Sequence, residues 1–121
     1  MNFIPPILTE KQIKYRNFLF NEIPFSKRKN LLVDDIAIYS VTSSYLANQM
    51  SKLIIKHLDN NLDVIILDGM ACVGGNTLSF SKYFPTILSN ELNQDRFNML
   101  MHNANIMEKQ IFVSLICQFL I

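Results

Sequence analysis

The segment of residues 67–77, LDGMACVGGNT, constrains the fold of this chain more than any other stretch. It contains all three glycines of the sequence. An unbroken apolar run, DVIILD at residues 63–68, leads into it, and residues 77–84 suit a short helix that Pro85 ends. Short apolar runs of this kind are typical of buried strands in parallel sheets. The sequence therefore predicts a strand, a glycine-rich turn and a helix in direct succession.

The N-terminal third is expected to begin with a helix. Thr9 and Gln12 have the spacing of a capping box, and Pro24 would end the helix that they begin. The basic residues 26–30, SKRKN, are expected to form a solvated connector, as most short charged runs do. Residues 31–42, LLVDDIAIYSVT, are rich in β-formers and predict an extended, strand-like segment.

From Ser43 onward, helical and strand patterns alternate. Thr42 or Ser43 would cap a helix with an apolar stripe at helical spacing. The stripe consists of Leu46, Met50, Leu53, Ile54 and Leu58. A strand at residues 86–91, a helix from Asn93 with an apolar face, and a third strand from residue 110 follow. The apolar face of that helix carries Phe97, Leu100, Met101 and Ala104. This order predicts an α/β fold with a parallel sheet and right-handed crossovers.

Composition excludes several classes of protein. Half of the 121 residues are hydrophobic and 17% are charged, so a packed core is expected and global disorder is not. The net charge of +1 gives no overall basic field. Cys72 and Cys117 form neither a disulfide framework nor a zinc site, and we expect no bound metal. The N-terminus does not resemble a signal peptide, and the longest apolar stretch, residues 111–121, is too short to span a bilayer. We therefore expect an intracellular protein, cytoplasmic or nuclear, that is neither secreted nor bound to a membrane.

A glycine-rich turn between a strand and a helix exposes backbone N–H groups that suit a phosphate, a carboxylate or a nucleoside cofactor. Gly69 and Gly74 have the glycine spacing of a P-loop, but Gly75 and Asn76 stand where that motif needs lysine and then serine or threonine. The G-x-G-x-x-G pattern of dinucleotide-binding turns is absent from the sequence. Both nucleotide classes are therefore disfavoured.

A third class of turn binds S-adenosylmethionine, which carries no pyrophosphate. Such a site needs an acid at the end of a strand, glycines that let the ligand approach the backbone, and a second acid after the next strand for the ribose hydroxyls. Asp68, Gly74 with Gly75, and Glu91 provide this set. The spacing between the two acids leaves room for one crossover helix between neighbouring strands. The alternative is an ordinary strand-to-helix turn whose strands happen to end in acids.

Residues 68–84, DGMACVGGNTLSFSKYF, resemble the first motif of class I S-adenosylmethionine-dependent methyltransferases. In particular they are similar to the RNA cap guanine-N2 (trimethylguanosine synthase-like) group, whose turn reads D-x-x-x-G-V-G-G-N-T. Residues 39–54, YSVTSSYLANQMSKLI, are similar to the F-S-V-T-P-E-x-I-A segment of that group. The resemblance runs over residues 39–107. It implies a Rossmann-like class I methyltransferase sheet with helices on both faces, in a domain at residues 39–121 that follows a helical extension at residues 1–38.

Carried over position by position, the resemblance implies a set of cofactor-binding residues. Asp68, Gly74 and Gly75 would line the methionine and ribose parts of S-adenosylmethionine. Glu91 would bind the ribose hydroxyls, and Thr42 would contact the amino-acid end of the cofactor.

The sequence departs from this group in three places. Cys72 replaces the first glycine of the turn, and Ser43 and Ser44 replace the P-E pair. The [ND]-P-P-[FYW] segment that holds the acceptor amine in this family is absent, since Pro5 and Pro6 form the only Pro-Pro pair. We therefore expect a partial domain, the N-terminal half of the family fold, with an unpaired sheet edge prone to association.

The leading hypothesis is an S-adenosylmethionine-dependent methyltransferase, or a fragment of one, that transfers a methyl group to an amine of RNA. The expected acceptor is the guanine N2 of a capped RNA. A cofactor-binding remnant or regulatory partner without catalysis is the alternative, and a nucleotide-binding module of P-loop ancestry is a third. No catalytic residue is assigned, because His57 and His102 suit ordinary helix positions and Cys72 has no predicted activating base.

Overall fold

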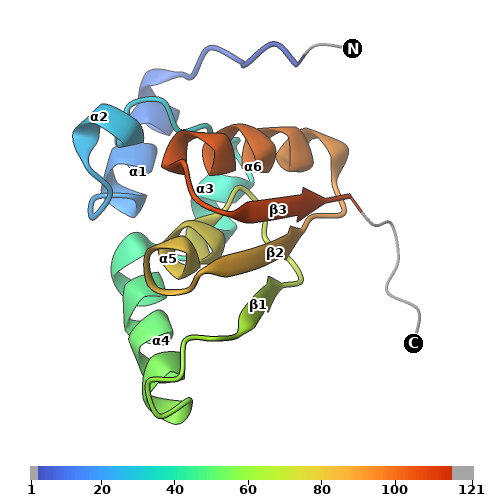
Figure 1. Ribbon diagram of the computed structural model, residues 1–121. Helices are drawn as coiled ribbons and strands as arrows, with labels where there is room; N and C mark the ends of the chain where they lie inside the picture. Colours follow the sequence, from blue (N-terminus) through green and yellow to red (C-terminus); the bar gives the residue numbers. More distant parts are fainter. Residues whose placement is uncertain (1–2, 116–121) are drawn as a thin grey trace.

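The computed structural model of the chain describes residues 3–115, which form six helices and three strands in an α/β arrangement (Figure 1). The helices are α1 (Glu10–Leu19), α2 (Phe25–Arg28), α3 (Ala37–Ser40), α4 (Ser44–His57), α5 (Gly75–Tyr83) and α6 (Gln94–Met107). The strands are β1 (Ile65–Asp68), β2 (Thr86–Asn90) and β3 (Ile111–Ser114). The alternation of helix and strand predicted from Ser43 onward is confirmed.

The capping box at the start of α1 is confirmed. The Thr9 hydroxyl accepts from the Gln12 N–H, and the Gln12 side chain accepts from the Thr9 N–H in return. The end of this helix differs from the prediction, because α1 stops at Leu19 and Pro24 instead caps the short helix α2. The expected connector at residues 26–30 therefore lies partly in a helix.

The strand-like segment predicted at residues 31–42 is wrong. Residues 37–40 form α3 instead, and residues 31–34 pair with no strand. The side chain of Asp34 explains the difference, because its Oδ1 accepts from the Ala37 N–H at 2.6 Å and caps the first turn of α3. A short capped turn has here overridden β propensity.

The three strands form one parallel sheet in the order β1-β2-β3. Asp68 of β1 lies opposite Ser89 of β2, and Ser89 lies opposite Val113 of β3. The predicted strands at residues 63–68 and 86–91 are thus adjacent and parallel, each slightly shorter than predicted. The part of the third predicted strand beyond Ser114 falls mainly on residues 116–121, outside the described residues.

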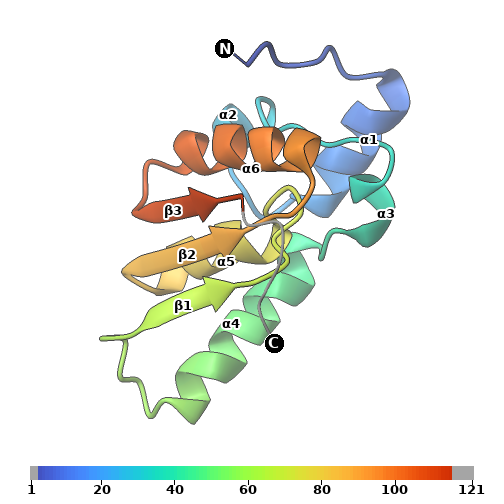
Figure 2. The ribbon, with the colours of Figure 1, turned by 90° about the vertical axis from the view of Figure 1, so that its right-hand side faces the viewer.

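Helices cover one face of the sheet. Side chains of α4 and α5 pack with Ile66, Ile87 and Ile111, which lie in register on that face. Met107 and Ile106 of α6 also pack with Ile111. Figure 2 shows α5 lying behind the strands, with α6 above them.

The other face of the sheet carries a row of exposed apolar side chains. Leu67, Leu88 and Phe112 lie opposite one another on the three strands and are 62%, 39% and 53% exposed. The prediction of helices on both faces is therefore wrong for residues 3–115. The two crossovers step in the same direction across the sheet, and crossovers of the common right-handed kind then place both helices on the same face.

The apolar stripe predicted for α4 has helical spacing, but it does not form the buried face of this helix. Leu46, Met50 and Leu53 are exposed, and only Ile54 and Leu58 are half-buried against the sheet. The buried face consists of the smaller residues Ser44, Ala47, Asn48 and Ser51. Small side chains here let α4 approach α5 closely, where the Ser51 and Ser79 hydroxyls form a buried hydrogen bond of 2.8 Å.

The main core joins the N-terminal segment to the sheet layer. Leu19, Phe20 and Leu31 pack in the same cluster as Val73 of the glycine turn and Met99 of α6. The predicted division at residue 38 into an extension and a second domain stays a prediction.

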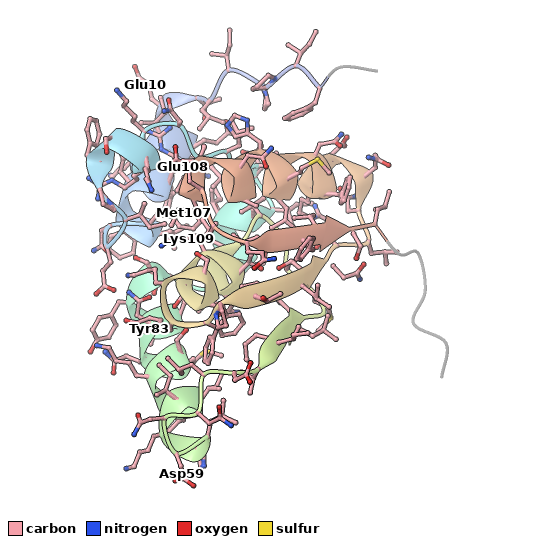
Figure 3. All side chains as sticks on the ribbon, in the orientation of Figure 1. Glu10, Asp59, Tyr83, Met107, Glu108 and Lys109 are labelled. Atoms are coloured by element: carbon pink, nitrogen blue, oxygen red, sulfur yellow. The ribbon has the colours of Figure 1, made fainter. Side chains whose placement is uncertain are left out.

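At the C-terminal end of α6, Glu108 adopts a left-handed φ of 56° and ends the helix before β3 (Figure 3). No helix within residues 3–115 is long and apolar enough to cross a membrane.

Candidate cofactor site

The two predicted acids meet at the carboxyl edge of the sheet. Asp68 is the last residue of β1, and Glu91 directly follows β2. Because β1 and β2 are adjacent and parallel, both carboxylates lie at the same end of neighbouring strands. Ligands of open α/β sheets bind at this edge.

The two glycines of the turn have different structural roles. Gly74 caps α5 with φ of 111°, a left-handed conformation that side chains other than glycine rarely adopt. Gly75 is the first residue of α5, and there is no room for a side chain at this position. A Cβ there would lie 2.5 Å from the carbonyl oxygen of Thr42 and 2.5 Å from Cγ2 of Val41. Gly75 therefore lets the turn pack directly on the backbone before α4.

This close packing brings Thr42 to the start of α5. The Asn76 side-chain amide donates to Thr42 Oγ1 at 3.3 Å. The other end of that amide, Asn76 Oδ1, is buried and has no hydrogen-bond partner among the described residues. Buried acceptors are nearly always bonded in folded proteins, so an orphaned one next to a helix N-terminus indicates a place for a donor group of a ligand. Sequence reasoning missed Asn76, although it belongs to the G-G-N-T pattern of the turn.

The Glu91 carboxylate joins the turn to the end of β2. Oε1 accepts from the Cys72 N–H at 2.9 Å, and Oε2 accepts from the Asn93 N–H at 2.8 Å. Glu91 is only 8% exposed, and Arg96 Nε lies 4.0 Å from Oε2. Each carboxylate oxygen has a second lone pair, so Glu91 can accept from a ligand hydroxyl without releasing the turn.

Asp68 faces α5. The Thr77 hydroxyl donates to Asp68 Oδ2 at 2.7 Å and lies 2.6 Å from the Ser89 hydroxyl. Since a hydroxyl has one proton to donate, Ser89 donates to Thr77 in this chain of contacts. Burial raises the pKa of Asp68, the Thr77 hydrogen bond opposes that shift, and the nearby charge of Glu91 adds to it. Asp68 thus fixes the first turn of α5 and does not extend freely into solvent.

Two further side chains attach the N-terminal segment to this edge, and neither was predicted. Arg96 lies 3.5 Å from Asp34 and also near Glu91, so it links the cap of α3 to the end of β2. Asn103 of α6 is fully buried, and its amide donates to the carbonyl oxygens of Leu32 and Val73 at 3.0 and 2.8 Å. Its Oδ1 accepts from the Leu32 N–H at 2.8 Å.

Cys72 stands where the similar methyltransferase turn has a glycine, and its φ is 55°. Its sulfur lies 3.7 Å from the Ser40 hydroxyl. Burial raises the pKa of the Cys72 thiol, which disfavours the thiolate that a nucleophile needs. The geometry agrees with a small turn residue.

The structure therefore gathers the five predicted residues along one strip. Asp68, Gly74, Gly75 and Glu91 surround the turn, and Thr42 reaches it through Gly75 and Asn76. Two hollows of about 500 and 400 Å³ lie elsewhere, and none of the five residues lines either of them.

Comparison with known proteins supports a relation to a methyltransferase family. The family model of RNA cap guanine-N2 methyltransferases matches residues 62–119, which include the turn, both acids and the described sheet. Thr42 lies outside the matched segment. An S-adenosylmethionine-type cofactor and an RNA substrate are general properties of such a family.

A viral protein is also similar to the chain. The uncharacterized protein L320 of Acanthamoeba polyphaga mimivirus is 24% identical over 111 residues. The alignment covers 75% of this chain, and the chain spans 43% of the length of the viral protein.

Proposed function

We propose that this chain binds S-adenosylmethionine at the turn of residues 68–77 and acts in methyl transfer to an amine of RNA, with the guanine N2 of the cap as the acceptor. When bound, the cofactor would supply the methyl group on its sulfonium sulfur. The contribution of the protein is to bind and orient, since methyl transfer by direct displacement depends mainly on alignment of donor and acceptor.

One observation carries the proposal. A left-handed glycine and a close-packed glycine lie between two strand-ending acids at the carboxyl edge of adjacent parallel strands. The same residues fall inside the segment that matches the RNA cap methyltransferase model. The edge thus places the glycine backbone next to two carboxylates. Carboxylates attract cations and accept hydrogen bonds from hydroxyl groups, so this edge suits a cationic ligand that carries hydroxyls.

Each side chain has a defined role in this proposal. Glu91 would accept from the ribose hydroxyls through its unused lone pairs while it holds the turn. Asn76 Oδ1 would accept from the ammonium group of the cofactor, and Thr42 would orient that amide. Asp68 would keep the first turn of α5 in place through Thr77.

A second function is favoured by one feature of the sequence. The 121 residues contain no [ND]-P-P-[FYW] segment, which seats the acceptor amine in this family. Binding of the cofactor without catalysis is therefore the second candidate, under which this chain alone would bind S-adenosylmethionine but would not methylate RNA.

Equilibrium dialysis with methyl-labelled S-adenosylmethionine tests the binding site. Glu91→Gln should weaken binding about tenfold or more, the range for hydrogen bonds to a charged group. Gly75→Ala should abolish binding, because its Cβ would collide with Thr42. Glu108→Gln removes the same charge from an exposed position at the end of α6 and should bind like the unchanged chain. Equal binding by all four proteins would refute the site.

Incubation with labelled cofactor and capped RNA then separates the two functions. A complete methyltransferase of the same family serves as the positive control. Label on the RNA above background would show that this chain seats the acceptor by itself and would exclude the non-catalytic candidate.

A further inference from the structure

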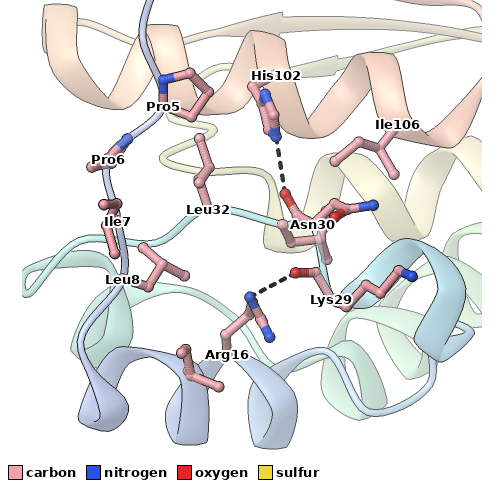
Figure 4. Close-up of a pocket in the computed structure, with 12 residues that line it drawn as sticks. Pro5, Pro6, Ile7, Leu8, Arg16, Lys29, Asn30, Leu32, His102 and Ile106 are labelled. Carbon is pink, nitrogen blue, oxygen red and sulfur yellow. Dashed lines mark hydrogen bonds between the residues drawn. The ribbon is translucent and has the colours of Figure 1, made fainter.

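A hollow of about 500 Å³ lies away from the candidate cofactor site, between the N-terminal segment and α6 (Figure 4). Residues 5–8 form one wall, and α1 contributes Ile13 and Arg16. Residues 29–32 contribute to its lining, and His102 and Ile106 of α6 complete it. This volume is within the range of small-ligand sites.

Arg16 gives the hollow a buried cation. This residue is 7% exposed, and Figure 4 shows its guanidinium pointing from α1 toward Lys29. Nη1 donates to the Lys29 carbonyl oxygen at 2.9 Å, and Nε and Nη2 donate to Asn17 Oδ1 at 3.2 and 3.1 Å. A guanidinium has five N–H groups, so one on Nη1 and one on Nη2 remain for a ligand.

No carboxylate balances this charge. Arg16 forms no ion pair within the described part of the chain, and no Asp or Glu is among the residues that line the hollow. Burial lowers the pKa of Arg16, and the charge of Arg28 lowers it further. Burying an unpaired cation next to another cation is costly, and a bound anion would remove that cost.

The other polar residues of the hollow are Lys29, Asn30 and His102. Arg16 contacts Lys29 through the Lys29 carbonyl oxygen, and Figure 4 shows the Lys29 side chain extending away from the guanidinium. The His102 ring points from α6 into the hollow, where Nε2 lies 2.9 Å from the Asn30 carbonyl oxygen (Figure 4). The remaining wall is apolar, and Figure 4 shows Pro5 and Ile106 on either side of the His102 ring. The hollow therefore combines a cationic end with flat and aliphatic surfaces.

We infer that this hollow binds a nucleotide, with its phosphate on Arg16 and its base against His102 and the prolines. The paired terminal N–H groups of a guanidinium match two oxygens of a phosphate. A base stacks through its face on an aromatic ring, and the His102 imidazole provides such a surface. A free mononucleotide and a nucleotide within an RNA chain share this chemistry.

The hollow is separate from the candidate cofactor site, so the inference does not depend on the proposed function. S-adenosylmethionine contains no phosphate, but its carboxylate also matches a guanidinium, so the cofactor is tested as a competitor. The probe is uridine 5′-monophosphate, because an adenine nucleotide would also resemble the cofactor. Saturating S-adenosylmethionine in a parallel titration distinguishes the two sites.

Amide NMR spectra of the full chain would be recorded during titration with uridine 5′-monophosphate, uridine, inorganic phosphate and a short single-stranded RNA. We expect the mononucleotide to shift the amides of residues 29–32 and 102–106 and to leave those of residues 74–77 in place, with or without the cofactor. Uridine and phosphate alone should bind at least tenfold more weakly than the nucleotide. If RNA shifts the same amides more strongly than the mononucleotide does, a nucleotide within an RNA strand is the preferred ligand.

Two variants test the contacts. Arg16→Gln should weaken nucleotide binding at least tenfold, whereas Lys14→Gln, an exposed change on the same helix, should leave it unchanged. Ile106→Phe fills the hollow without changing charge and covers the case in which Arg16→Gln does not fold. Unchanged binding in Ile106→Phe, or nucleotide shifts confined to residues outside the hollow, would overturn the inference.

Discussion

Asn103 is the residue whose replacement tests the packing of the candidate site most directly. Its side chain makes three buried hydrogen bonds, two with Leu32 and one with the Val73 carbonyl oxygen. Its bonds connect α6 to both the segment after α2 and the glycine turn. Asn103→Ala removes all three bonds and leaves three backbone groups without partners in the core.

The expected loss is large compared with the stability of a small domain. Three net hydrogen bonds at about 1 kcal/mol each give about 3 kcal/mol, and the orphaned buried groups raise this to about 5 kcal/mol. The free energy of unfolding of a domain of this size is about 5–15 kcal/mol, so the variant should lose a large fraction of its stability. Asn103→Asp has nearly the same shape and can still accept from Leu32. Its carboxylate would face two carbonyl oxygens, so we expect a loss at least as large at neutral pH.

Urea unfolding followed by circular dichroism measures these changes, with the slope of the transition as a check that the unfolded state is unaltered. Asn105→Ala, two positions along the same helix and exposed, is the matched control and should change stability by less than about 0.5 kcal/mol. If Asn103→Ala lowered the free energy of unfolding by less than about 1 kcal/mol, the reasoning would be refuted. Three buried backbone groups left without hydrogen bonds should cost more than that.

Three further changes have defined outcomes. Burial raises the pKa of Asp68 above 3.8, so folding favours its protonated form and stability falls as pH rises from the unfolded-state pKa through the raised one. Urea unfolding across acidic pH should show that Asp68→Asn lacks this fall, and an unchanged pH profile would contradict it. Cys72→Gly should raise the free energy of unfolding by up to about 1 kcal/mol, because glycine adopts the left-handed φ without strain. A lower stability in the same assay would show that the thiol contacts outweigh the strain. Leu67→Thr combined with Leu88→Thr should reduce self-association measured by sedimentation, and an unchanged distribution of species would exclude this face as the cause.

The sequence predicted the α/β alternation because glycines, prolines and hydrophobic periods mark it locally. The strand-turn-helix unit around Gly74 was predicted for this reason. The capping box of Thr9 and Gln12 was also predicted from a local pattern. Residues 31–42 were mispredicted because one carboxylate, Asp34, satisfies the start of α3 and outweighs the propensity of the β-formers around it.

The pattern of the site was visible in the sequence, but its supports were not. Asp68 and Glu91 stand at strand ends, where topology alone brings them together. Asn103 carried no signal, since an asparagine on an apolar helix face is read as a surface residue until its partners, 71 and 30 positions away, are known. The same holds for Arg16, whose basic character gave no indication of burial.

The exposed face of the sheet explains why the strands carry consecutive apolar residues. Strands with one solvated face alternate between apolar and polar residues, whereas strands covered on both faces are apolar throughout. Ile65, Ile66 and Leu67 follow one another in β1, and Leu88 and Phe112 continue the outward row on the other strands. The outward residues therefore have the composition of a buried surface, although the helices of residues 3–115 leave them exposed. β1 is also an edge strand of the described sheet, so its outward backbone groups and the apolar face lie side by side. Burial of that face and pairing of that edge are favourable together, which is the physical reason for expecting the chain to associate through them.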